Sequence, residues 1–177
     1  MNKQYIVILT FPQKIETEIK ALRDKYNKAT SQIIPHVTLK QPSYLLSDES
    51  SIKEELREIA RVTNPFIIEL DGLSYFQNQK NTAYIALKDK TSVTELHKKI
   101  VYALQGKVDE VKKERFELEN FTPHATIGEY LSKEDIKIIK QELSYYNPSY
   151  SIPIDSFSLY SADSRLQWEP VEEFKLG

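Results

Sequence analysis

Short runs of apolar and β-branched residues alternate along this chain with segments whose apolar positions recur every three or four residues. The runs predict β-strands, and the helical spacing predicts α-helices. Strands are expected at 5–11, 33–42, 121–130, 151–161 and 166–176, with two more within 65–88 around a polar turn at 77–81. Helices are expected at 12–30, 47–64, 92–106 and 132–147. Pro42 is expected to end the strand at 33–42, and Pro153 indicates that the strand at 151–161 lies at an edge of the sheet or begins with a bulge.

Strands and helices alternate irregularly, and some neighbouring strands are joined as hairpins. This order is typical of an α+β fold rather than of a doubly wound parallel sheet. At 177 residues the chain is expected to form one domain over residues 1–177. The charged segment 107–119 is not assigned by its pattern: a helix end, a mobile loop and a bridge between lobes all fit.

Composition narrows the classes of function. The net charge is −2, which argues against binding to duplex DNA but leaves room for a small phosphorylated ligand. The chain has no cysteine, so disulfides, thiolate nucleophiles and cysteine zinc sites are excluded. Its apolar runs are too short to cross a membrane, and no signal peptide is recognisable, so a cytoplasmic protein is expected.

Two of the three histidines stand in nearly the same pentapeptide. "PHVTL" contains His36 and "PHATI" contains His124. We call His36–Leu39 the first motif and His124–Ile127 the second motif. Because residues i and i+2 of a strand point to the same face, each motif presents one imidazole and one hydroxyl together, from Thr38 or from Thr126. The intervening apolar residues face the opposite side.

Two imidazoles and two hydroxyls around one small volume suit phosphoryl chemistry without a metal. A neutral imidazole can accept a proton, and a protonated one can donate to the leaving oxygen. The threonine hydroxyls can donate hydrogen bonds to the non-bridging oxygens. A structural role is the alternative: a single strand histidine is more often a packing residue, and threonine is common in strands. The repetition of the pattern favours catalysis by His36 and His124.

The two tetrapeptides His36-Val37-Thr38-Leu39 and His124-Ala125-Thr126-Ile127 resemble the H-x-T-x signature of the 2H phosphoesterase superfamily, which includes 2′-5′ RNA ligase and cyclic phosphodiesterase-like proteins. Among its members the chain is similar to bacterial YjcG-type phosphoesterases. The resemblance implies a bilobal fold with pseudo-twofold symmetry, two antiparallel sheets that line a central cleft, helices outside and one motif in each of two intertwined lobes. It also implies hydrolysis of a 2′,3′-cyclic phosphate or a 2′-5′ linkage, without a metal or other cofactor.

Further candidates for contact with substrate are weaker. Tyr84 and Tyr160 are candidates for base stacking or phosphate contact, although core packing is the more frequent role for strand tyrosines. Lys40 shares the face of His36 and Thr38 by period two, and it either contacts phosphate or ends the strand in solvent. His97 lies outside any such motif, on a helix, and is expected at the surface or its boundary.

Several alternatives stay open. A zinc site is disfavoured because neither motif carries a nearby carboxylate on its face and no H-E-x-x-H helix occurs. A binding module that holds a nucleotide or an RNA end would use the same residues without turnover. RNA ligation and degradation of a cyclic oligonucleotide signal are further possibilities. The expected partner is a nucleotide or an RNA end, with neither DNA nor a membrane, and the chain is expected to be a monomer. The sequence leaves the acid and base roles of the two histidines unassigned.

Overall fold

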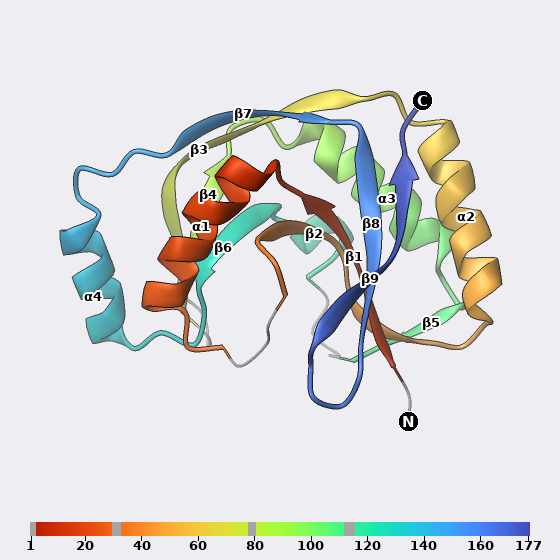
Figure 1. The fold of residues 1–177 in the computed structure, drawn as a ribbon, viewed down its shortest axis with the longest axis horizontal. Helices are drawn as coiled ribbons and strands as arrows, with labels where there is room; N and C mark the ends of the chain where they lie inside the picture. The colour runs from red at the N-terminus through yellow and green to blue at the C-terminus, as the bar shows by residue number, and fades with distance from the viewer. Residues whose placement is uncertain (1–2, 30–32, 78–80, 112–115) are drawn as a thin grey trace.

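A computed structural model describes residues 3–29, 33–77, 81–111 and 116–177 (Figure 1). Within these residues the strands form one sheet in the order β7-β3-β4-β6-β2-β1-β8-β9, with β5 paired to β2, and every pairing is antiparallel. The strands are β1 (Gln4–Thr10), β2 (His36–Leu45), β3 (Phe66–Phe76), β4 (Thr82–Leu87), β5 (Val108–Glu110), β6 (His124–Gly128), β7 (Ser149–Ile154), β8 (Ser156–Ala162) and β9 (Trp168–Lys175).

The helices form where helical spacing predicts them. They are α1 (Gln13–Tyr26), α2 (Glu49–Arg61), α3 (Thr91–Ala103) and α4 (Lys133–Glu142). Helix α4 begins with a capping box, in which Ser132 and Asp135 satisfy each other's backbone N–H groups. Gly106, just beyond α3, has a φ of 75°, a conformation that favours glycine after a helix end. The predicted α+β class is therefore confirmed.

The sheet has two halves that meet between β2 and β6. One half contains β6, β4, β3 and β7, and the other contains β2, β1, β8 and β9. The unit β4-α3-β6 in one half corresponds to β1-α1-β2 in the other, which is the pseudo-twofold relation implied by the resemblance. Helix α1 packs against β6, whereas α3 packs against β2, so each helix covers the motif strand of the opposite half (Figure 1).

The apolar residues that alternate with the motif histidines and threonines lie in the core, as their alternation predicts. Val37, Leu39, Ala125 and Ile127 are all fully buried. They pack in a cluster that includes Ile19 of α1 and Leu96 of α3. Burial of this apolar surface stabilises the centre of the sheet, and it forces the alternate residues of each motif onto the other face.

Two predicted strand boundaries are wrong. Strand β2 continues past Pro42 to Leu45, because the proline falls within an irregular stretch of the pairing with β1, where a missing N–H costs no ladder bond. The predicted strand 151–161 is two strands. β7 pairs with β3, and β8 pairs with β1 in the other half, so the chain changes halves at Asp155. Pro153 lies on the edge strand β7, as predicted.

The charged segment 107–119 contains one short strand and the start of a short helix. Strand β5 pairs with the end of β2, and a 3-10 helix, η1, spans Leu118–Asn120. Residues 112–115 lie outside the described part, as does most of the predicted turn at 77–81. None of the helices in the described ranges is long and apolar enough to span a membrane.

Candidate active site

The two motifs meet at the centre of the sheet. Val37 of the first motif and Ala125 of the second are register partners in the antiparallel pairing of β2 with β6. In such a register His36 lies opposite Thr126, and Thr38 lies opposite His124. The two imidazoles are then diagonal neighbours on one face of the sheet.

Each imidazole is oriented by a backbone carbonyl two residues earlier. His36 Nδ1 lies 2.6 Å from Ile34 O, and His124 Nδ1 lies 2.7 Å from Thr122 O. The residue between each carbonyl and its histidine is a buried proline, Pro35 or Pro123, which fixes its own φ and restricts the residue before it to extended conformations. The prolines therefore help to orient the two carbonyls toward the imidazole rings.

These bonds determine which nitrogen of each neutral ring is free to accept a proton. A carbonyl only accepts, so Nδ1 must carry a proton in both histidines. In the neutral ring Nε2 is then the basic nitrogen. His36 Nε2 lies 3.1 Å from Thr38 Oγ1, whose hydroxyl can donate to it. The first motif thus holds its threonine and its imidazole in direct contact.

The electrostatic surroundings of the two histidines differ. Burial, together with the smaller effect of the nearby charges of Arg23 and His124, lowers the pKa of His36 to about 4, against the opposing hydrogen bond to Ile34. Burial also lowers the pKa of His124, whereas the Thr122 carbonyl and Glu129 favour its cation. The two motifs are therefore related by pseudosymmetry in their backbone but not in the charged residues that surround their histidines.

Arg23 of α1 is a site residue that the sequence reasoning missed. Its Nη1 donates a hydrogen bond of 2.8 Å to Ile34 O, the same carbonyl that orients His36. Burial lowers the pKa of the Arg23 guanidinium, but an arginine stays charged at any working pH. The spacing of α1 gives no sign of this role, because only the tertiary fold brings α1 to the start of β2.

The predicted aromatic Tyr84 lies beside the second motif. It is the register partner of Thr126, and its ring centroid lies 5.0 Å from that of His124. Phe76 of β3 stacks on Tyr84 at 4.2 Å and meets the His124 ring edge-on at 5.0 Å. Tyr84 is 7% exposed, so little of its ring is open to a ligand. Phe76 was not singled out from the sequence, since one aromatic in a strand carries no distinguishing signal.

Tyr160 lies on the other half of the sheet. It lines an open depression of about 550 Å³ together with Thr10 and Ile34, and Thr10 is the register partner of His36. Glu16 and Glu173 also line this depression. Burial, followed by these two carboxylates, raises the pKa of the Tyr160 phenol. Tyr160 is thus placed near the first motif, on the side away from Tyr84.

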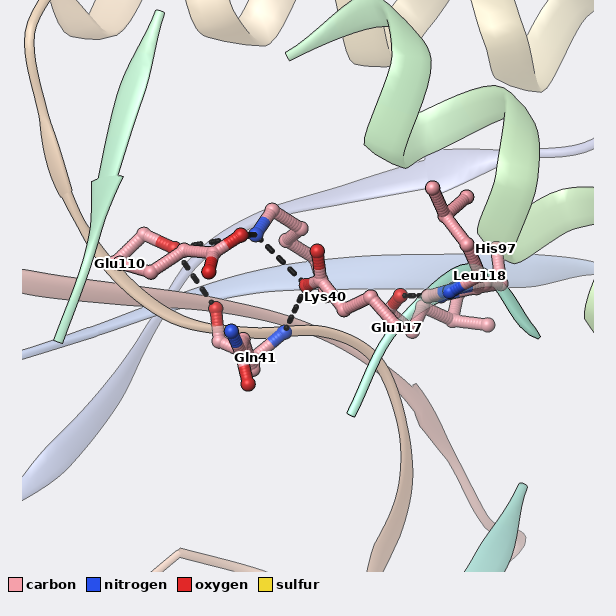
Figure 2. A network of polar contacts seen from close by, with 8 residues as sticks. Lys40, Gln41, His97, Glu110, Glu117 and Leu118 are labelled. Carbon is pink, nitrogen blue, oxygen red and sulfur yellow. Dashed lines mark hydrogen bonds and ion pairs between the residues drawn. The ribbon is translucent and has the colours of Figure 1, made fainter. Parts of the chain in front are cut away.

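The structure places Lys40 away from the motif face. Thr38 pairs with Ile8, but Lys40 pairs with Val7, so one extra residue of β2 is accommodated between them. This bulge reverses the alternation and turns Lys40 toward the core face, to which Val7 belongs. Lys40 Nζ is buried and lies 2.7 Å from Glu117 and 3.2 Å from Glu110 (Figure 2). The prediction that it contacts phosphate or solvent is therefore wrong.

The prediction for His97 is also wrong. The ring is 1% exposed and stacks on Phe121, with centroids 3.7 Å apart. The signal was available, because His97 follows Val93 by four residues and so falls on the apolar stripe of α3. Two charged neighbours, Lys98 and Lys99, conceal that position in the sequence.

No group of three or more potential metal-ligating side chains occurs among the described residues. The motif face itself presents two imidazoles with their hydroxyl neighbours. Proton transfer to and from a phosphate ester is a reaction that such a set can carry out.

Comparison with known proteins agrees with this geometry. The model of the 2′-5′ RNA ligase superfamily matches residues 11–165. Two bacterial relatives are each named "Putative phosphoesterase": that of Oceanobacillus iheyensis is 33% identical, and that of Bacillus cereus strain B4264 is 31% identical. The first alignment covers 96% of both chains, and the second covers 96% of this chain and 95% of the relative.

Solved structures share the fold. Apo LigT of E. coli has a TM-score of 0.68 at 16% identity, over 99% of this chain and 98% of that one. LigT complexed with 3′-AMP has a TM-score of 0.63 at 16% identity, over 99% of both chains. With two H-x-T-x motifs joined in register at the centre of such a fold, the chain belongs to the 2′-5′ RNA ligase superfamily, among the 2H phosphoesterases.

Proposed function

We propose that this protein is a metal-independent phosphodiesterase that hydrolyses a 2′,3′-cyclic phosphate or a 2′-5′ linkage at the end of a nucleotide or a short RNA. His36 and His124 are the general base and general acid. Thr126 donates a hydrogen bond to a non-bridging oxygen, and the Thr38 hydroxyl, which contacts His36 Nε2 in the free protein, does the same once a substrate is bound. The observation that carries the proposal is the Val37–Ala125 register, which sets two imidazole–hydroxyl pairs on one face.

Water is the nucleophile in the proposed reaction. Nε2 of the base takes a proton from water as its oxygen attacks phosphorus. The bond from phosphorus to one ribose oxygen breaks, and the protonated Nε2 of the acid gives its proton to that oxygen. Arg23 disfavours the cation of His36 and Glu129 favours that of His124, so we assign His36 as base and His124 as acid.

Two observations outside the motifs support a nucleotide substrate. LigT, which shares this fold, has been crystallised in complex with 3′-AMP, ATP and phosphate. In the present chain the depression beside the first motif is of the size that small ligands occupy. Two aromatic residues line it, the buried Phe11 and the more exposed Tyr160, and Tyr160 is our candidate for contact with the base or the ribose. Tyr84, mostly buried, has the lesser role of supporting His124.

The experiment is hydrolysis by chelator-treated protein of a panel of substrates, followed by phosphorus NMR of the products. The panel contains 2′,3′-cyclic mononucleotides, RNA oligomers that end in a cyclic phosphate, and 2′-5′ oligoadenylates. We expect turnover of at least one member to a monoester or a shorter oligomer. Saturable binding of these nucleotides without any turnover would contradict the proposal and identify a binding module. An RNA-joining activity under the same conditions would identify a ligase.

A further inference from the structure

A polar network, buried at Lys40, His97 and Glu117, links the strand of the first motif to the chain that leads into the second. It contains Lys40, Gln41, His97, Glu110, Glu117 and Leu118 (Figure 2). We call residues 116–123, which run from the network to His124, the coupling segment. None of these residues takes part in the proposed reaction, so their burial and bonding call for another explanation.

His97 of α3 makes one hydrogen bond to each side. Its Nδ1 lies 2.6 Å from the backbone oxygen of Leu39, the last residue of the first motif. Its Nε2 accepts a 2.9 Å hydrogen bond from the backbone N–H of Leu118 in the coupling segment. Because the first partner only accepts and the second only donates, both bonds form together only in the neutral ring with its proton on Nδ1.

Two further contacts hold the same segment against β2. Glu117 accepts hydrogen bonds from Lys40 Nζ at 2.7 Å and from the backbone N–H of Gln41 at 3.3 Å. Phe121 stacks on the His97 ring with an angle of 4° between the planes. Residues of β2 and α3 thus contact the coupling segment as far as Phe121. The next residue, Thr122, supplies the carbonyl that orients His124.

The backbone of the coupling segment needs such support. Leu118 has a φ of 54°, the left-handed region that costs a non-glycine residue free energy. Its N–H group is the one bonded to His97, so the bond and the strained conformation occur at the same residue. Without that bond, the polar N–H of Leu118 would lose its partner.

We propose that His97 is a positioning residue, which ties the first motif to the coupling segment and so sets the placement of His124 relative to His36. It does not touch the reacting atoms. The expected effect of His97 on turnover rests on the proposed function. Its expected effect on the placement and titration of His124 does not, because that effect needs no substrate. Burial, Lys40 and Lys98 lower the pKa of His97, in keeping with a neutral ring.

The test compares wild type with His97→Phe, which keeps a ring against Phe121 but removes both hydrogen bonds. The control is Ile100→Val, a truncation of a buried residue on the same helix that leaves those bonds in place. We measure the titration of His36 and His124 by NMR, together with kcat and KM on a hydrolysed substrate. Should His97→Phe fail to fold, His97→Asn replaces it, since its amide can donate to Leu39 O but does not reach Leu118.

We expect His97→Phe to change the titration of His124, while Ile100→Val leaves it as in wild type. The expected kcat falls by roughly 10- to 100-fold with KM within about threefold, because small misplacement of a catalytic group is costly. Wild-type titration of His124 with wild-type kcat in folded His97→Phe would overturn the inference. If wild type itself hydrolyses nothing, the proposed function fails, and the NMR titration alone still decides the role of His97.

Discussion

Val37 and Ala125, the second residues of the two motifs, are register partners at the point where the two halves of the sheet join. Neither side chain is exposed. A shift of this register by one residue would turn one motif's histidine and threonine to the core face. The placement of all four polar side chains thus depends on the packing of two small apolar ones.

The threonine hydroxyls are expected to act in the transition state. Thr38→Val and Thr126→Val each remove one hydrogen-bond donor while keeping a β-branched side chain on the strand. We expect kcat to fall by roughly 10²- to 10³-fold, with a smaller change in KM, because the donors serve developing charge. Thr82→Val is the matched control, as Thr82 is a buried strand threonine outside the motifs. Equal kcat in Thr126→Val and Thr82→Val would contradict the assignment.

The lowered histidine pKa values predict an acidic optimum. With His36 as base, kcat/KM rises as that group loses its proton near its pKa of about 4. It falls as His124 loses its proton, below the usual value of about 6.5 because burial lowers that pKa as well. The kcat/KM profile should therefore be bell-shaped with its maximum between pH 4 and pH 6.5. A profile that rises continuously above pH 7 would be inconsistent with a histidine acid.

The same shifts affect folding. The unfolded chain binds a proton at His36 near pH 6.5, whereas the folded chain binds it only near pH 4. Stability from the neutral ring is thus present above pH 6.5 and is lost as the pH falls toward 4. Urea unfolding should show a smaller loss over this range in His36→Ala than in wild type. Identical pH slopes in the two proteins would argue against a buried neutral His36.

The Lys40–Glu117 pair is expected to be necessary for stability. Lys40→Met leaves a buried carboxylate without its cation, which costs about 3–5 kcal/mol in such pairs. Burial already raises the pKa of Glu117, so protonation relieves part of this cost. We therefore expect the destabilisation of Lys40→Met to be smaller at pH 5 than at pH 7. Lys40→Met with Glu117→Gln serves as control and should show little of this pH dependence.

The motif residues could be predicted because a strand has a period of two, and a repeated pattern fixes two faces at once. Lys40 shows the limit of that reasoning, since a single bulge reverses the alternation and no residue type in the sequence signals it. The break at Asp155 was missed for a related reason: serines alternate with apolar residues in both strands around it, and only the pairing partners distinguish the two strands. Arg23 reaches the site only through the packing of α1.

The most direct test of the account is the rate of hydrolysis of the best substrate by wild type, His36→Ala and His124→Ala, each folded and treated with chelator. Two cooperating imidazoles predict that either substitution lowers kcat by roughly 10²- to 10⁴-fold, while chelator leaves the wild-type rate unchanged. Substantial turnover in either variant, or loss of wild-type activity on chelation that a divalent metal restores, would contradict the two-histidine mechanism.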